Sequence, residues 1–153
     1  MTQHNLRKLG FDLSVDLRLE RPVIADGRMQ PHEWLLSTES KVLKADSGSH
    51  GDDHFFPGPT DIAWDLAGAI VEWKMDDQQA AEFLNIYRHA SGDDANARID
   101  GFMRAYAVFR LAYCLMAANA MQGSDEHLRL QRDVGTYRAV LTHMQTSTLS
   151  AAV

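Results

Sequence analysis

The sequence predicts an α+β protein in which a strand-rich N-terminal part precedes a mostly helical lobe. Apolar and polar residues alternate strictly from Phe11 to Glu20, which is typical of a half-buried strand. From Asp61 onward, apolar residues recur at helical spacing instead. The 153 residues, 45% of them hydrophobic, suffice for one core, so a single domain is expected. Its parts are N-terminal β-hairpins over residues 1–46, an acidic loop over 47–60 and four helices over 61–146.

Two hairpins are expected in the N-terminal part. The short apolar run from Val23 to Ala25 leads into Asp26-Gly27, a dipeptide that is favoured in two-residue hairpin turns. Residues 34–36 and 42–45 flank a polar loop, which predicts the second hairpin. Residues 47–60 carry three Gly and two Pro, so no regular element is expected there.

The expected helices have recognisable start and stop signals. Thr60 or Asp61 caps the first helix, and Asp76 with Gln79 three residues later forms a capping box for the second. Gly123 ends the third helix. The four helices are expected at residues 61–75, 76–90, 94–121 and 124–144, with a frayed tail from 145 onward.

The third helix is expected to be the buried central helix, because residues 105–120 are apolar nearly all round. Cys114 lies in this run and is expected to pack there rather than to react. Arg98, Arg104 and Arg110 on the same helix are expected to form ion pairs with acidic residues rather than to clamp a substrate.

Composition argues against several classes of function. Fifteen Lys and Arg against twenty-one Asp and Glu give a formal net charge of −6, so no nucleic-acid partner is expected. The lone cysteine excludes an internal disulfide framework and fits a reducing compartment. The first ten residues lack the apolar stretch of a signal peptide, and the longest apolar run, 111–118, is far shorter than a membrane span. We therefore expect a cytoplasmic protein without membrane contact.

The negative charge is concentrated in residues 45–77, which hold eight acids and one base. The acids are Asp46, Asp52, Asp53, Asp61, Asp65, Glu72, Asp76 and Asp77, and the base is Lys74. A solvated acidic face is one interpretation. The same segment also holds His50, His54, Trp64 and Trp73, a mixture more typical of a site. Clustered carboxylates repel one another unless a cation, a base or water screens them.

The order of parts in this region is distinctive. Asp26 lies in a loop, Glu33 precedes a hairpin strand, and the returning strand ends at Asp46, with Gly48 two residues on. The acidic loop follows, and then a helix that opens DIAWDLAGA at residue 61. This order resembles the C-terminal lobe of the aminoglycoside phosphotransferase and choline kinase group, which has a protein-kinase-like fold. By motif, the resemblance covers residues 21–73, about a third of the chain.

The resemblance implies a role for each matched residue. Asp46 is matched to the acid that holds Mg²⁺ at the end of the hairpin, and Glu33 to the second Mg²⁺ ligand, where the family usually has Asn. Asp26 is matched to the acid that accepts the proton of the substrate hydroxyl. Asp65 is matched to the helix acid that braces the catalytic loop, and Asp61 gives structural support at the start of the helix. The implied activity is phosphoryl transfer from ATP to a small-molecule hydroxyl.

The sequence departs from the family pattern in three respects. Ile24 stands where the family has His, and Asp26 and Glu33 lie seven residues apart where the pattern has five. Only 25 residues precede Asp26, without a Gly-rich loop, so the N-terminal ATP-binding lobe is expected to be missing. Lys44, on the strand into Asp46, is a lower-ranked site candidate, but the sequence alone does not make it a replacement for the lysine of that lobe. We therefore expect a truncated or degenerate member, inactive alone, whose partner is the missing lobe.

A second register places the catalytic loop at His50-Gly51-Asp52, because this string is typical of the family. Asp61 or Asp65 would then hold Mg²⁺. We disfavour this register because residues 54–61 leave no room for two strands and a turn. His50 and His54 also suggest zinc, but a Gly/Pro loop without a third soft ligand does not favour it.

Simpler interpretations stay open for the same acids. Asp26-Gly27 also suits an ordinary hairpin turn, Glu33 a surface acid at a strand edge, and Asp46 a cap of the following turn. The alternative for the whole chain is a non-catalytic helical interaction module that forms a homodimer. Such a module would associate through apolar surface on the hairpin side or through the edge of the strand at 11–19.

Overall fold

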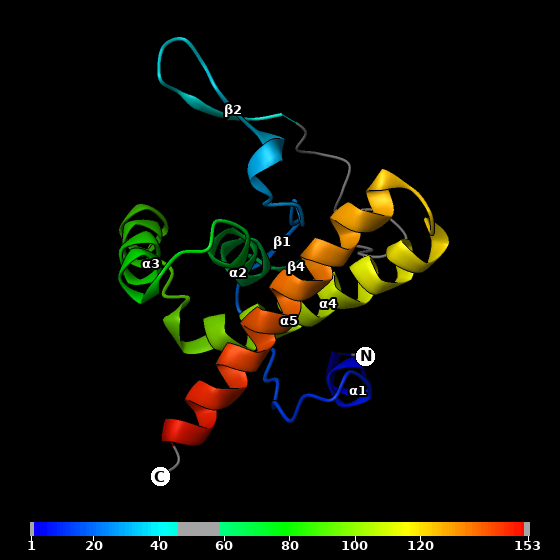
Figure 1. The fold of residues 1–153 in the computed structure, drawn as a ribbon. Helices are drawn as coiled ribbons and strands as arrows, with labels where there is room; N and C mark the ends of the chain where they lie inside the picture. Colours follow the sequence, from blue (N-terminus) through cyan, green and yellow to red (C-terminus); the bar gives the residue numbers. More distant parts are fainter. Residues whose placement is uncertain (1, 46–58, 152–153) are drawn as a thin grey trace. The chain divides into compact units, whose positions relative to one another are not determined.

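A computed structural model describes residues 2–45 and 59–151 (Figure 1). These residues form five α-helices and two antiparallel sheets of two strands each, so the predicted α+β class is confirmed. The chain divides into two compact units, residues 1–16 with 104–153 and residues 17–103. The boundary lies inside helix α4 (Asn96–Ala120). The expected single domain and its internal boundaries stay predictions.

The first unit contains α1 (Thr2–Lys8), the C-terminal part of α4, and α5 (Asp125–Ala151). Helix α1 was not expected from the sequence. The helix ends at Lys8, and Gly10, with φ of 86°, lets the chain turn back on it. The N–H of Gly10 donates to Arg7 O and the N–H of Phe11 to Leu6 O. Fully buried side chains come from all three helices, including Leu6, Leu111 and Leu141.

The predicted strand from Phe11 to Glu20 is wrong, because among the described residues no strand pairs with this segment. Side chains, rather than a partner strand, form hydrogen bonds with part of the backbone of this segment. The two ends of the Gln3 amide bond to Leu13 O and Val15 N, and Arg104 Nη1 donates to Ser14 O. Phe11 and Leu13 are buried, whereas Leu17 and Leu19 are 42% and 66% exposed, so the alternation matches one-sided burial only at the start of the segment.

Helices α4 and α5 differ from the prediction in two ways. Tyr113 and Met116 of α4 are 38% and 54% exposed, so the apolar middle of this helix is not buried on all sides. The tail expected to fray is helical, because α5 continues to Ala151 and no Gly or Pro interrupts it after Gly135. None of the described helices is long and apolar enough to cross a membrane. The cytoplasmic location stays a prediction.

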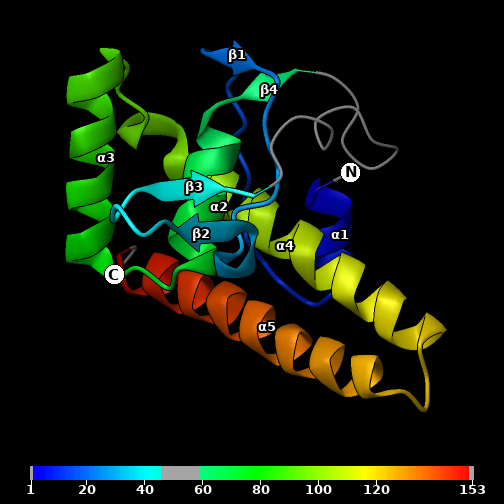
Figure 2. The same cartoon turned by 90° about the horizontal axis from the view of Figure 1, so that it is seen from above.

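The second unit begins with a small sheet that brings distant segments together. Strand β1 (Pro22–Val23) pairs with β4 (Thr60–Asp61), with Val23 opposite Thr60 (Figure 2). The expected hairpin turn at Asp26-Gly27 is therefore wrong, because β1 pairs with a later strand. Position 27 still favours glycine, because its φ of 75° lies in the left-handed region.

The second expected hairpin is present as a two-stranded ribbon. Strands β2 (Trp34–Leu36) and β3 (Val42–Lys44) pair with Leu35 opposite Leu43, directly after the 3₁₀ turn η1 (Pro31–Glu33). The connecting turn closes through Ser40 N to Ser37 O and Ser37 N to Lys41 O. Ser40 takes the left-handed conformation, with φ of 59°.

Two helices follow β4 in this unit, α2 (Ala63–Glu72) and α3 (Asp77–Ser91). Helix α2 starts later than expected because Thr60 and Asp61 belong to β4, yet Asp61 still accepts the N–H of Ala63. The predicted capping box at the start of α3 is confirmed. Asp76 accepts the N–H of Gln79, and the Gln79 side chain accepts the N–H of Asp76.

Candidate functional site

Four of the predicted site residues come together within residues 17–103. They are Asp26, Glu33, Lys44 and Asp65, from the loop after β1, from η1, from the end of β3 and from the first turn of α2. Asp61 lies in a different cluster, and the other candidates, Asp46, His50, Asp52 and His54, lie outside the described residues.

Asp65 holds the backbone of the loop that carries Asp26. Its Oδ2 accepts the N–H of Asp26 at 2.9 Å and its Oδ1 accepts the N–H of Gly27 at 2.9 Å. Burial raises the pKa of Asp65 above its ordinary value, and the two hydrogen bonds only partly oppose this rise. One carboxylate thus fixes two successive peptide groups of this loop.

Further contacts fix the rest of this loop. Trp73 Nε1, just beyond α2, donates to Met29 O at 3.0 Å. The N–H of Glu33 donates to Gln30 O at 3.0 Å, and the N–H of Ala45 donates to Glu33 O at 2.7 Å. The loop is therefore held at its start, middle and end by groups from α2 and from the ribbon.

Lys44 lies between the two acids of the site. Its Nζ is 3.2 Å from Asp26 Oδ1 and 3.8 Å from Glu33 Oε2. All three side chains are between 11% and 14% exposed, so water screens these charges less than it would at the surface. Lys44 Nζ also lies 5.7 Å from the ring centroid of Trp34, which stands edge-on to Trp73 at 6.4 Å.

The donor set decides whether these residues can hold Mg²⁺. The carboxylates of Asp26 and Glu33 are the oxygen ligands that Mg²⁺ prefers. However, the Lys44 ammonium lies between them, and the described residues contain no group of three or more acids, histidines or cysteines able to hold a metal. Two carboxylates with an ammonium between them are too few ligands for the ion, so a Mg²⁺ site here would also need a ligand such as Asp46, and the Mg²⁺ roles of Glu33 and Asp46 stay predictions.

The indole N–H of Trp34 is buried and faces no hydrogen-bond acceptor among the described residues. A buried donor usually has a partner, so this position favours a water molecule or a ligand oxygen as acceptor. Trp73 belongs to the site-like mixture of residues noted in the sequence, whereas Trp34 was not expected at the site, although it lies next to the predicted acid Glu33 in the sequence.

Asp61 belongs to a second charged cluster that holds the unit together. Arg98 Nε donates to its Oδ1 at 2.9 Å, and the N–H groups of Glu20 and Arg21 donate to its Oδ2. Burial alone would raise the pKa of Asp61, but the hydrogen bonds outweigh burial and lower it. The structural role expected for Asp61 therefore has a geometric basis, at a place separate from the Lys44 contacts.

Arg98 is almost fully buried and also pairs with Asp93, which in turn accepts the hydroxyl of Tyr87 at 2.8 Å. Hydrogen bonds from Arg98 and Tyr87 outweigh burial and lower the pKa of Asp93. Asp93 was not predicted as part of a cluster, because an acid between two helices is most often an N-cap of the second helix. Arg104 and Arg110 make different contacts from Arg98, to Ser14 O and to the Tyr137 hydroxyl.

Comparison with protein-family models, with curated proteins and with solved structures finds no match to this chain.

Proposed function

We propose that residues 17–103 form the acceptor-binding part of a phosphotransferase-like lobe, in which Asp26 binds the hydroxyl group of a small molecule. The observation that carries this proposal is the pair of hydrogen bonds from the N–H groups of Asp26 and Gly27 to Asp65. A catalytic acid must be held in a fixed position to contribute, and here its backbone is fixed by the adjacent helix. The same arrangement is implied by the resemblance to the aminoglycoside phosphotransferase and choline kinase group.

Each side chain then has a defined task. The Asp26 carboxylate accepts a hydrogen bond from the acceptor hydroxyl and takes its proton as that oxygen bonds to the γ-phosphorus of ATP and ADP leaves. Lys44 fixes the Asp26 carboxylate from the side of the ribbon. The Trp34 N–H supplies a donor to an oxygen of the acceptor.

ATP and Mg²⁺ belong to the proposal as cofactors. Glu33 and Asp46 are the proposed ligands of the ion, whose positive charge would offset charge on the phosphates. ATP binding requires a nucleotide-binding lobe in addition to the described residues, so we expect no turnover from the present chain alone.

Thermal unfolding with and without Mg²⁺, each with and without ATP, tests the proposal. We expect Mg²⁺ to raise the unfolding midpoint of the wild type, because an ion that binds only the folded chain stabilises it. The rise should disappear in Asp46→Ala and Glu33→Gln. It should increase in Lys44→Met, which removes the competing ammonium.

Glu82→Gln is the matched control, because Glu82 is an exposed acid on α3 away from these contacts. An equal Mg²⁺ effect in all five proteins would contradict the proposal, as would no effect in any of them. ATP-dependent phosphoryl transfer by the purified chain would contradict only the requirement for another lobe.

A non-catalytic interaction module is the second candidate. The observation that favours it is the pairing of Lys44 with both Asp26 and Glu33, which also suits a purely structural anchor for the ribbon. In that case Lys44→Met destabilises the fold and creates no response to Mg²⁺, so the same experiment separates the two candidates.

A further inference from the structure

The β2–β3 ribbon is fixed at its base. Trp34 packs edge-on against Trp73, and Lys44 pairs with Asp26. The N–H of Ala45 also donates to Glu33 O, directly below the first strand pair. The outer half of the ribbon is therefore presented in a defined orientation rather than as a free loop.

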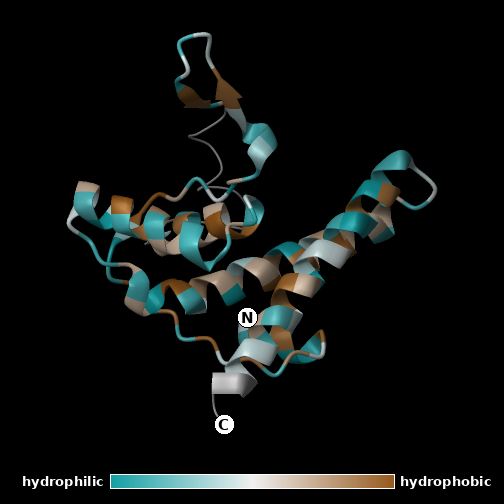
Figure 3. Ribbon diagram, turned by 60° about the vertical axis from the view of Figure 1, so that its left-hand side comes forward, coloured by the Kyte–Doolittle hydropathy of each residue, from teal (hydrophilic) through white to brown (hydrophobic). Residues whose placement is uncertain are grey.

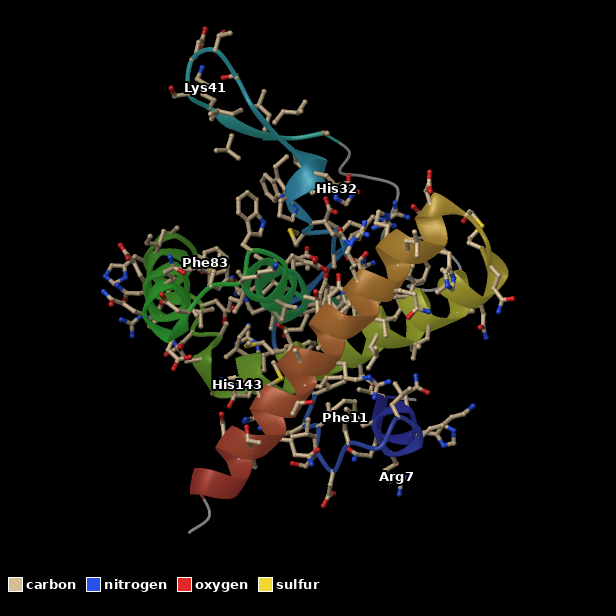
Figure 4. All side chains as sticks on the ribbon, viewed as in Figure 1. Arg7, Phe11, His32, Lys41, Phe83 and His143 are labelled. Carbon is tan, nitrogen blue, oxygen red and sulfur yellow. The ribbon has the colours of Figure 1, made fainter. Side chains whose placement is uncertain are left out.

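This outer half is apolar on both faces. Directly opposite residues of an antiparallel pair share a face, so Leu35 and Leu43 lie on one face and Leu36 and Val42 on the other. Their exposures are 57%, 50%, 74% and 61%. Figure 3 shows the two strands in the hydrophobic colours beneath a hydrophilic tip, and Lys41 marks that tip in Figure 4, at the opposite end from His32.

The backbone groups at the edge of β2 are partly open. The bonds from Ser37 N to Lys41 O and from Ala45 N to Glu33 O mark hydrogen-bonded pairs of the ladder. Pairs alternate in an antiparallel ladder, so the backbone N–H and C=O of Leu36 and Val42 point away from the partner strand. In the described part of the chain, β2 pairs with β3 alone.

The two edges of the ribbon differ in charge. Lysine on an edge strand is a common protection against pairing with another chain. Strand β3 has Lys41, whose side chain is 69% exposed, immediately before it, whereas Trp34, Leu35 and Leu36 of β2 carry no charge. The unprotected edge is therefore β2.

We propose that β2 is a self-association edge, at which two copies of this chain pair β2 with β2 antiparallel about a twofold axis at Leu35. The result is a four-stranded sheet. The N–H of Trp34 already donates to Pro31 O. The pairing therefore uses the N–H of Leu36 in one copy as donor and the carbonyl of Trp34 in the other copy as acceptor. Each copy donates once and accepts once. This inference does not depend on the proposed function.

Charge and packing select this register. With Leu35 on the axis, the Leu35–Leu43 pairs of the two copies form one continuous apolar row, and Glu33 lies opposite Ser37. A shift that puts Leu36 on the axis places Glu33 opposite Glu39, and like charges directly opposite are destabilising. A second copy also offers a strand of the same length as β2.

The available area indicates a transient pairing. Four side chains of this size, half to three-quarters exposed, offer about 200 Å² of apolar surface per copy. A stable interface buries about 800 Å² per partner. We therefore expect a dissociation constant of about 0.1–1 mM, and a dimer that forms only at high concentration.

Amide exchange with water in the wild-type chain, followed by NMR from about 10 μM to about 1 mM, tests the pairing without any substitution. We expect exchange at Leu36 to slow about threefold while exchange at Val42, which also points outward but on the β3 edge, stays constant. Concentration-independent exchange at Leu36, or equal slowing at both residues, would overturn the proposal.

Sedimentation velocity over the same concentrations measures dimer formation in a matched pair of variants. Leu36→Pro and Val42→Pro each remove an outward N–H without removing a ribbon hydrogen bond. We expect only Leu36→Pro to abolish the dimer. Leu35→Lys should abolish the dimer too, and this variant keeps the test valid if proline disturbs the ribbon. The control is Leu128→Lys on α5, where the apolar side chain is 58% exposed, and this variant should leave the dimer intact. A monomer throughout, or a dimer that Leu36→Pro and Leu35→Lys leave intact, contradicts the proposal.

Discussion

At the scale of single residues, Ser40 holds a backbone conformation that favours glycine. Its φ of 59° closes the three-residue turn of the ribbon, where hairpins of this type usually place Gly. We expect Ser40→Gly to stabilise the ribbon by about 0.5 kcal/mol, because relief of the left-handed strain outweighs the added chain entropy. Slower amide exchange at Ser37 in the variant than in the wild type would show this stabilisation. Thr38→Gly, at a residue without positive φ, should act in the opposite direction.

Arg98 is the residue on which the second unit depends most. Its guanidinium pairs with Asp61 and Asp93, and Asp61 is fully buried. Arg98→Met leaves two carboxylates without their cation, so we expect a loss of about 3–5 kcal/mol in the free energy of unfolding. Urea unfolding measures this loss. The control Arg88→Met, at an exposed position of α3, should change it by less than about 0.5 kcal/mol. A loss no larger than the control's would show that the buried pair is dispensable.

At the scale of elements, the capping box of α3 makes a quantitative prediction. Asp76 and Gln79 each bond to the other's backbone N–H. We expect Asp76→Ala to reduce the free energy of unfolding by about 1 kcal/mol, because one N–H at the helix start loses its acceptor. Asp77→Ala, which removes a first-turn acid but no cap, should cost only a few tenths of this amount. Equal losses would show that charge rather than capping matters.

The elements that could be predicted are those with local signals. The Asp76–Gln79 box, Gly92 and Gly123 set the limits of α3 and α4 within a few residues. Helix α1 also has a local signal for its end, namely Arg7 and Lys8 in its last turn shortly before Gly10. The segment from Phe11 onward could not be assigned in this way, because its partners are side chains distant in the sequence, such as Gln145.

At the scale of the whole molecule, two groups of carboxylates give opposite pH dependences. The lowered pKa values of Asp61 and Asp93 mean that their contribution to stability is present above the ordinary value of 3.8 and is lost as the pH falls through the lowered values. The raised pKa of Asp65 acts the other way, since its contribution is greatest at low pH and declines as the pH rises through that value. Below about pH 4 the contribution of Asp65 no longer changes, whereas those of Asp61 and Asp93 are lost, so we expect the free energy of unfolding to fall there.

Urea unfolding at several pH values between about 2 and 7 checks this expectation. Arg98→Met should flatten the acid side of the profile, because Asp61 and Asp93 lose a partner of their ionised forms. The same steepness in the variant and in the wild type would mean that other carboxylates control acid unfolding.

The candidate site was predictable in part. Asp26, Glu33 and Asp65 were predicted through the family resemblance and Lys44 as a lower-ranked candidate, and the structure brings the four together. The contact of Lys44 with both acids was not predicted. It depends on which face of the ribbon carries Lys44, the last residue of β3. The roles of Trp34 and Trp73 depend on the same placement of the ribbon against the end of α2.

The most direct test of the proposed site is a calorimetric titration of Mg²⁺ into the wild type and into Glu33→Gln, with Glu82→Gln as the control. We expect saturable binding to the wild type and the control, weakened at least about tenfold in Glu33→Gln because one oxygen ligand loses its charge. No heat of binding to the wild type, or equal affinity in all three proteins, would contradict a cation site at Glu33 and leave Lys44 and its two acids as the anchor of the ribbon.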